Sequence, residues 1–588
     1  MKAILIYTAL FISLSFNKCF AQTGWVWGVG QTLSDPVGFT EALAGGIDKD
    51  GNILTALSTS CDSAHFGSFV IRNTGHVQKL VVTKVDTAGN VLWAFGTKKA
   101  KAAPAGLACD TAGNVYVYAI FEGDSINVGG VTLFGSVGHL SDFLIKLSPT
   151  GTVIWAKIIA MANYGGGMYM PISGPRLGID KAGFFYVHGY FSVTTPIVIG
   201  TTTLMSRGAS DGYIAKYDQS GNVIWARSYG AASGSEVARN IAVSPKGNIY
   251  GSGSFSSDTL VIGSDTLYDP YLTSIGTKAM LNYLVKFDSS GTAVWARAFD
   301  KRITISELAL DAIEGVYAVG RIDSSIILGH DTLITAGDRD VLTMKFDSSG
   351  SLLWARSAGG TGSDYGNSIA IDSCRNVWIN GAFGGNTGYT MNFSGHTLAA
   401  PGGTYGDPMF MVEYDYMGNF VNSATLDCGG DDFCGMYMDG RGNIALAGDM
   451  TWPMVVGHDT LSFDTTTVTT EFFFNARYNY RLEACVFHDS VAHIDSSYLA
   501  VNALQFDAAS LQLHPNPATS EFTISCNVPF SEGSIASLYD VTGKLITTYA
   551  VTGNDVSLQL RNITSGLYLC KITNGNDLYA IKKLVVAR

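Results

Sequence analysis

The sequence predicts an all-β protein: a seven-bladed β-propeller of four-stranded blades, followed by a small C-terminal β-sandwich. Three observations lead to this prediction. Two short motifs alternate at a fixed period along most of the chain. Gly contributes 68 residues and aromatic side chains 11%, which is typical of turn-rich β structure. Only 15% of the residues are charged, which disfavours helix bundles and disorder.

The first motif reads apolar-Asp-x-x-Gly-Asn-apolar-aromatic and recurs seven times with some drift. Its copies begin at Ile47, Cys109, Ile179, Val243, Leu310, Ile371 and Met438. The period of about 65 residues leaves room for four strands and long loops in each unit. The Asp-x-x-Gly segment suits a hairpin, because Asp caps the turn amides and Gly adopts the left-handed conformation.

The second motif follows each copy of the first: an alternating strand, a turn, and a strand that ends in Trp-Ala. The tryptophans are Trp93, Trp155, Trp225, Trp295 and Trp354, and the sixth and seventh copies are degraded. Large flat side chains at one position per unit are expected to pack one sheet against the next rather than to stack on a ligand.

Four antiparallel strands in each of seven units is the pattern of a propeller. A β-solenoid is the competing fold, but its coils are much shorter than this period. We expect Trp25-Val26-Trp27 to pair with the last blade and close the ring. The repeats, for instance Asp211 to Ala226, resemble the SBBP type of β-propeller repeat of exported bacterial proteins, over most of residues 25–486. That resemblance implies an architecture and leaves ligand and reaction open.

The N-terminus has the three parts of a secretory signal: Met1-Lys2, an apolar run from Ala3 to Phe16, and a small residue, Ala21, for cleavage. The alternative is a buried N-terminal helix. We therefore expect a signal peptide at 1–21, the propeller at 22–486 and a linker at 487–510. No later stretch is long enough for a transmembrane helix.

Short alternating strands separated by Gly, Asn and Pro predict a β-sandwich at 511–588. This segment resembles the type A C-terminal sorting domain of the type IX (Por) secretion system of Bacteroidetes. The resemblance implies passage by the Sec route, contact with the type IX machinery, and a protein that is secreted or held at the outer cell surface. The residues that match the family's motifs are Pro515, Asn516, Pro517, Gly543, Lys544, Gly566, Tyr568, Lys583, Val585 and Val586.

The sequence contains no assembled catalytic or metal-binding motif. Its ten histidines form no zinc pattern, and neither a nucleophile elbow nor a phosphate-binding loop is present. No catalytic residue, metal or cofactor is therefore predicted. Cys428 and Cys434 bracket a flexible segment and are a candidate disulfide in an exported chain. Cys526 and Cys570 share the inward parity of their strands and are expected as core thiols or a buried bridge.

The net charge and the positions of the loops narrow the range of expected functions. The formal net charge of −12 disfavours nucleic acid and anionic membranes as partners. We expect a monomeric scaffold that binds a glycan, matrix or protein ligand, and the alternative is a hydrolase or lyase acting on an extracellular polymer at the propeller channel. The Asp-x-x-Gly turns emerge on one face and the longer connections on the other. These predicted recognition segments include Ala160 to Pro175, Asp269 to Lys278, Gly384 to Pro408 and Cys428 to Cys434. Loops held by a rigid scaffold favour the second face for recognition. The aromatic candidates on that face are Tyr164, Tyr169, Tyr271, Tyr389 and Tyr405.

Overall fold

The computed structural model divides into two compact units, Met1–Arg481 and Leu482–Arg588, which are described separately. All regular elements in the described residues are strands. The described residues are 24–30, 32–33, 40–73, 77–135, 140–162, 177–192, 196–270, 280–385, 388–400, 408–426, 434–439, 443–450, 454–456, 459–461, 472–479, 512–530, 534–540, 545–560, 563–574 and 577–587.

Seven sheets of the first unit share one antiparallel order of four strands, and in six of them the strands follow the order of the chain. The first three are β3 (Thr40–Ile47), β4 (Ile53–Thr59), β7 (Lys79–Val85), β8 (Val91–Gly96); β9 (Lys101–Cys109), β10 (Val115–Glu122), β13 (Leu140–Leu147), β14 (Val153–Ala162); and β15 (Leu177–Ile179), β16 (Phe185–Ser192), β19 (Ser210–Tyr217), β20 (Val223–Tyr229). The next three are β21 (Glu236–Val243), β22 (Ile249–Phe255), β25 (Leu281–Phe287), β26 (Ala293–Ala298); β27 (Ile303–Leu310), β28 (Val316–Ile322), β31 (Asp340–Phe346), β32 (Leu352–Gly359); and β33 (Tyr365–Ile371), β34 (Val377–Ala382), β37 (Met409–Tyr414), β38 (Phe420–Leu426).

The seventh sheet combines the two ends of the unit. It consists of β39 (Cys434–Met438), β40 (Asn443–Met450), β43 (Phe472–Asn479) and β1 (Gly24–Gly30). β1 pairs antiparallel with β43, so the expected pairing of Trp25-Val26-Trp27 with the last sheet is confirmed. The first and last sheets also touch, because the hydroxyl of Thr55 on β4 lies 3.0 Å from Oδ1 of Asn475 on β43.

A small two-stranded hairpin occupies the connection between the second and third strands of each of these seven sheets. These hairpins are β5 (Ser63–Phe66) with β6 (Phe69–Arg72), β11 (Ser125–Val128) with β12 (Val131–Phe134), β17 (Ile197–Ile199) with β18 (Thr202–Leu204), β23 (Thr259–Ile262) with β24 (Asp265–Tyr268), β29 (Ile326–Leu328) with β30 (Asp331–Leu333), β35 (Thr390–Phe393) with β36 (His396–Ala399), and β41 (Met454–Val456) with β42 (Asp459–Leu461). β2 (Thr32–Leu33) adds to β5, and β35 adds to β32.

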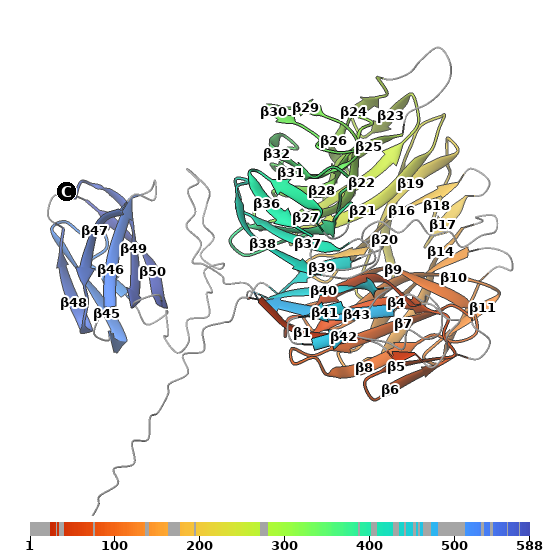
Figure 1. Cartoon of the computed structure of the whole chain (residues 1–588), viewed down its shortest axis with the longest axis horizontal. Coiled ribbons are helices and arrows are strands. Elements are labelled where there is room, and N and C mark those ends of the chain that lie inside the picture. Colours follow the sequence, from red (N-terminus) through yellow and green to blue (C-terminus); the bar gives the residue numbers. More distant parts are fainter. Residues whose placement is uncertain are drawn as a thin grey trace, which may run out of the picture. The chain divides into compact units, whose positions relative to one another are not determined.

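The sheets are arranged with their first strands together. β3 contacts β9, β9 contacts β15, and so on in chain order to β39, which contacts β3 in turn. Figure 1 shows β9, β21 and β39 toward the middle of the unit, and the hairpins β5–β6, β23–β24 and β29–β30 toward its outside. The result is a propeller-like all-β architecture in which each hydrophobic core lies between neighbouring sheets.

The Asp-x-x-Gly turns form as the sequence predicts. In the turn after β19, Oδ1 of Asp218 accepts hydrogen bonds from the backbone amides of Ser220 at 2.9 Å and Asn222 at 2.8 Å. Gly221 adopts φ +77°, which glycine tolerates. Although partial burial raises the pKa of Asp218, these hydrogen bonds hold it below its ordinary value. The side chain is thereby committed to the turn.

The repeated tryptophans bind the turn of the next sheet. Nε1 of Trp295 donates a hydrogen bond to the carbonyl of Ser348 at 3.0 Å, and Nζ of Lys286 reaches the same oxygen at 3.2 Å. The indole packs over Gly350, where an added Cβ would come within 2.9 Å of the ring. Trp93, Trp295 and Trp354 are buried, whereas Trp155 and Trp225 are half-buried in the same contact. The tryptophans therefore pack between neighbouring sheets as predicted, but the equal burial expected of a repeated position is not found.

The turn between β27 and β28 differs from the repeat at Glu314, and this difference compensates for a second one at Ser244. Glu314 adopts φ +65°, at a position where the preceding units have glycine. Its carboxylate accepts a hydrogen bond from Tyr250 at 2.9 Å and pairs with Lys286 at 3.2 Å. In other sheets the tyrosine at the position of Tyr250 donates a hydrogen bond to the aspartate of its own turn, as Tyr186 does to Asp180 at 2.9 Å. In the unit of Tyr250 that aspartate is replaced by Ser244, so Glu314 supplies the missing carboxylate from the neighbouring sheet.

The second unit consists of two sheets with an apolar interior between them. One sheet contains β44 (Gln512–His514), β45 (Glu521–Phe530) and β48 (Gly553–Gln559), and the other contains β47 (Leu545–Ala550), β46 (Ser534–Asp540), β49 (Gly566–Asn574) and β50 (Asp577–Val586). Phe522, Leu538 and Ile572 are fully buried between them. Cys570 is a buried free thiol, which agrees with the predicted core thiol rather than with the predicted buried bridge. Burial raises the pKa of this thiol to about 12.

Candidate ligand-binding face

The strand order gives the first unit two unlike faces. The two turns of each sheet, first to second strand and third to fourth strand, emerge on one face, which we call the turn face. The connections that leave the second and fourth strands emerge on the other, which we call the loop face. Parts of the predicted recognition segments 160–175, 269–278, 384–408 and 428–434 lie outside the described residues.

The structure describes one of the five candidate tyrosines. Tyr164, Tyr169, Tyr271 and Tyr405 lie outside the described residues. The hydroxyl of Tyr389 donates a hydrogen bond to Asp364 at 2.9 Å and accepts one from the amide of Gly362 at 2.7 Å. Burial, together with the neighbouring Asp364, raises the pKa of this phenol. Tyr389 thus holds its own loop against the segment that joins the fifth and sixth sheets, and a role in ligand binding stays a prediction.

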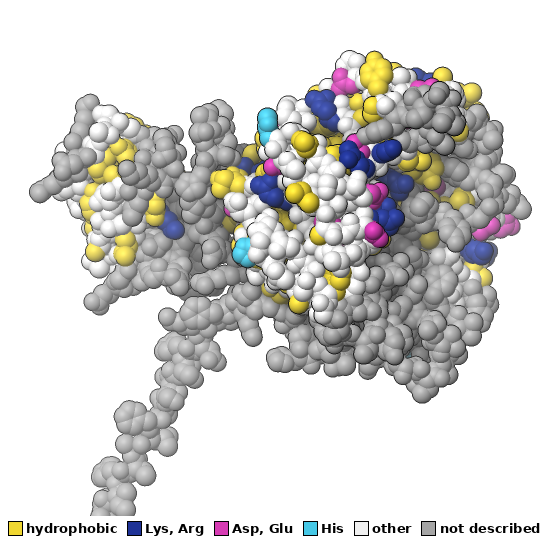
Figure 2. Space-filling model, turned by 45° about the horizontal axis from the view of Figure 1, so that its top comes forward, with side chains coloured by type: hydrophobic (Ala, Val, Ile, Leu, Met, Phe, Trp, Pro, Cys, Tyr) yellow, Lys and Arg dark blue, Asp and Glu magenta, His cyan; other side chains and the backbone are white. Residues whose placement is uncertain are grey.

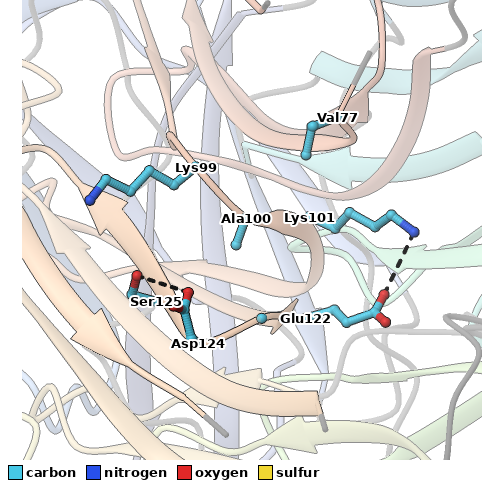
Figure 3. A pocket seen from close by; sticks show the side chains of 8 residues that line it. Val77, Lys99, Ala100, Lys101, Glu122, Asp124 and Ser125 are labelled. Atoms are coloured by element: carbon cyan, nitrogen blue, oxygen red, sulfur yellow. Dashed lines mark hydrogen bonds and ion pairs between the residues drawn. The ribbon is translucent and has the colours of Figure 1, made fainter. Parts of the chain in front are cut away.

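A pocket of about 380 Å³ opens on the loop face beside the second sheet. Its lining residues are Val77, Lys99, Ala100, Lys101, Glu122, Gly123, Asp124 and Ser125. Nζ of Lys101 lies 3.7 Å from Oε2 of Glu122, and the hydroxyl of Ser125 donates to Asp124 at 3.2 Å. Figure 3 shows Lys101 directed toward Glu122 while Lys99 points the other way.

The backbone explains why charged groups meet in this pocket. Lys101 begins β9 and Glu122 ends β10, so the antiparallel pairing places them opposite each other at the edge of the sheet. Lys99 adopts φ +80°, a conformation that is uncommon for a residue with a side chain and is often found at functional sites. Sequence reasoning missed these residues. The signal that could have revealed them is the run Lys98-Lys99-Ala100-Lys101, in a chain with 37 Lys and Arg among 588 residues.

The described residues also bear on possible metal sites and disulfides. Among the described side chains, no group of three or more His, Cys, Asp or Glu is placed to hold a metal ion. Cys61 and Cys109 are free thiols, and Cys374 is disulfide-bonded. Cys428 and the side chain of Cys434 also lie outside the described part, so their predicted bridge stays a prediction.

In the second unit, the predicted motif residues at the start and end of the domain meet. Oδ1 of Asn516, between Pro515 and Pro517, accepts a hydrogen bond from the amide of Val585 at 2.8 Å. The amide of Ala518 donates to the carbonyl of Val585 at 2.7 Å, and Ala518 bridges the buried Val586 in parallel. The Pro-Asn-Pro segment therefore fixes the last strand.

The remaining motif residues have structural positions where they are described. Gly566 begins β49 and pairs with Val586. Tyr568 is buried, and its hydroxyl donates to the carbonyl of Thr564 at 2.9 Å. Lys583 lies on β50, but its side chain is outside the described part, as are Gly543 and Lys544.

Residues 512–587 match the family model described as the secretion system C-terminal sorting domain. The chain carries this sorting domain. The sorting domain indicates export by the type IX secretion system, to the cell surface or into the medium. Among the described residues, no helix has both the length and the apolar character needed to span a membrane.

Other similarities are distant. An uncharacterized WD repeat-containing protein of Acanthamoeba polyphaga mimivirus is 24% identical over 412 residues, and the match covers 58% of this chain and 29% of that protein. The chain thus spans less than a third of the length of this relative. A protein of unknown function from Dyadobacter fermentans is similar in structure with a TM-score of 0.35 at 11% identity, covering 79% of this chain and 100% of that one.

A surface component of the type IX secretion system of Porphyromonas gingivalis, PorZ, has a TM-score of 0.21 at 10% identity, covering 93% of this chain and 81% of its own. An apocarotenoid oxygenase of Synechocystis has a TM-score of 0.30 at 10% identity, covering 70% and 94%.

Proposed function

We propose that the first unit is a seven-bladed β-propeller of the SBBP type that binds an extracellular glycan, matrix or protein ligand across its loop face. A Sec signal at 1–21 and the sorting domain route it out of the cell. The seven sheets, the contacts between successive first strands and the pairing of β1 with β43 support the propeller.

The observation that carries the binding function is the pocket around Lys101 and Glu122. The repeated aspartates and carbonyls of the turn face are committed to the fold, since carboxylates such as Asp218 cap turns and carbonyls such as that of Ser348 accept hydrogen bonds from the tryptophans. The pocket on the loop face, by contrast, exposes two lysines and two carboxylates around a cavity. Polar groups that converge on a concave site are the usual mark of ligand recognition.

The experiment is an array of glycans and matrix proteins probed with the full chain lacking only residues 1–21. The loop-face variant combines Lys99→Gly, which suits the positive φ, with Lys101→Ser. The matched control is Lys49→Ser, because Lys49 is an exposed lysine of the turn face that likewise pairs with a carboxylate, Asp50, at 2.7 Å.

We expect at least one ligand on the array, and weaker binding of it by the loop-face variant than by the control. If Lys49→Ser removed binding and the loop-face variant kept it, the ligand would occupy the turn face. Turnover of an arrayed polysaccharide would instead favour the hydrolase or lyase alternative.

A further inference from the structure

A second group of charged side chains lies on the loop face, where the fifth and sixth sheets meet. The guanidinium of Arg321 lies 5.5 Å from the ring centre of Tyr365, and that of Arg339 lies 5.8 Å from it. Arg339 also donates a hydrogen bond to the Tyr365 hydroxyl at 2.8 Å. Nε of Arg321 and Nε of Arg339 lie 3.3 and 3.7 Å from the same oxygen, Oδ1 of Asp323. Two arginines therefore share one ring and one carboxylate.

This arginine pair lies at the edge of the strands that line the middle of the unit. Arg321 is next to the last residue of β28, Arg339 directly precedes β31, and Tyr365 begins β33, a first strand. The side chains of Arg321 and Arg339 are 31% and 42% exposed, so both can be reached from solvent. Figure 2 shows that Lys and Arg side chains on the visible face form small groups with Asp and Glu, separated by uncharged surface.

The fold itself does not require this arginine pair. The backbone arrangement that surrounds it, which we call the frame, also occurs between the third and fourth sheets, where the arginines are absent. Arg339 forms a parallel bridge with Ser363, and Ser210 forms the corresponding bridge with Ser235. In both frames a carboxylate accepts a hydrogen bond from a loop amide: Asp364 from Gly360, and Glu236 from Ala231.

Pairing identifies the residues that correspond to the cluster in the other frame. Arg321 pairs with Val341, the residue after Asp340, and Tyr190 pairs with Gly212, the residue after Asp211. Tyr365 follows Asp364 as Val237 follows Glu236. The positions of Arg321, Arg339 and Tyr365 thus hold Tyr190, Ser210 and Val237 in the other frame, which has no charge at these places.

Other arginines of the unit each have their own aromatic or carboxylate partner. Arg297 lies over the ring of Trp295 at 5.6 Å and donates to the carbonyl of Ala296 at 2.8 Å, and Arg227 and Arg356 repeat this arrangement. Arg302 forms two hydrogen bonds of 2.7 Å with the carboxylate of Asp300. Arg321 and Arg339 instead share the single carboxylate of Asp323.

We propose that Arg321 and Arg339 form a subsite for the carboxylate or sulfate groups of an acidic polysaccharide. The planar fork of a guanidinium matches such oxyanions, and the ring of Tyr365 and its hydroxyl fix both forks before the ligand arrives. A chain with a net charge of −12 attracts an acidic polymer only through a local site of this kind. A single pair of arginines, without a basic stripe, suits spaced charges on a sugar chain better than a continuous phosphate backbone. This subsite rests on the proposed function and names its ligand class.

The test measures binding of the full chain lacking residues 1–21 to oligomers of polymannuronate, to dextran sulfate and to unmodified dextran by calorimetry. The variant Arg321→Tyr/Arg339→Ser carries the residues of the other frame, which the fold already accommodates. Arg297→Gln is the control, since it removes an arginine outside the cluster. Circular dichroism and the thermal midpoint verify that each variant is folded.

We expect the chain to bind polymannuronate or dextran sulfate but not dextran. The double variant should weaken that binding by roughly tenfold or more, because two charge-assisted contacts are lost. The control should retain it, and the two acidic polymers together show whether a uronate or a sulfate is preferred.

Failure to bind either acidic polymer, or equal binding by the double variant, would overturn this subsite. If the array of the preceding section still yielded a neutral glycan or a protein ligand, the proposed function would stand without it. If the array yielded nothing, both would fall.

Discussion

Glu314 illustrates at the scale of single residues how the repeat tolerates change. Its carboxylate is the only one that the described contacts give to Tyr250 and Lys286, and Asn248 also donates to it at 3.0 Å. Burial by itself raises the pKa of Glu314, but these hydrogen bonds and the charge of Lys286 hold it below its ordinary value. The loss of an aspartate at Ser244 and the gain of Glu314 therefore form one compensated exchange between neighbouring sheets.

This exchange predicts a non-additive pair of substitutions. Glu314→Gly leaves the buried Lys286 without a carboxylate, and it should lower the free energy of unfolding by about 2 kcal/mol, since relief of the positive φ offsets part of the cost. Adding Ser244→Asp should recover most of this loss, because the aspartate restores the arrangement of Tyr186 with Asp180. Urea denaturation of the wild type, both single variants and the double variant measures the coupling. Additive effects would show that Ser244 and Glu314 do not exchange roles.

At the scale of elements, Glu307 connects three of the first strands. It lies on β27 beside a bulge, and it accepts hydrogen bonds from the hydroxyl of Ser368 and, at 2.9 Å, from the amide of Ile369 on β33. The Ser368 hydroxyl in turn accepts a hydrogen bond from the amide of Met436 on β39 at 3.0 Å. Burial raises the pKa of Glu307 from 4.5 to about 7, although the two hydrogen bonds that it accepts oppose the shift.

The raised pKa predicts a stability that falls as pH rises. Between pH 4.5 and about 7 the folded state retains a proton that the unfolded state has released, so the free energy of unfolding decreases across this window. Glu307→Gln imitates the protonated form and should remove this decrease. The variant should match the wild type near pH 4.5 and exceed it by about 3 kcal/mol at pH 8. Urea denaturation at both pH values measures the difference, and equal pH profiles of the two proteins would contradict it.

The elements were largely predictable because their signals are local. Asp218 and Gly221 identify a turn through their own backbone requirements, and Trp295 identifies a packed position because it recurs once per unit. The hydrogen bond of Trp295 to Ser348 was not predictable, since it depends on which carbonyl the next sheet presents. The same holds for the pocket, whose walls come from strand ends that become opposite only after the sheet forms.

At the scale of the whole molecule, the sorting domain makes export testable. In a type IX-competent host, removal of residues 511–588 should leave the first unit in the periplasm. The matched variant Asn516→Ala keeps the domain but removes the hydrogen bond that holds Val585 in the last strand. It should reduce the exported amount to an intermediate level. Fractionation followed by immunoblotting measures both, and unchanged surface and medium levels after the deletion would contradict export through this domain.

The pairing of β1 with β43 has a consequence for how the chain matures. β1 leaves the ribosome first, whereas its partner strand emerges only after six sheets have been synthesised. Until then the two halves of the seventh sheet exist apart, and each offers an unpaired edge. Such edges recruit other strands, so a truncated or stalled chain is a candidate for exchange with a second copy. Completion of the seventh sheet thus waits for β43, and we expect this pairing between the two ends of the unit to be among the last contacts to form.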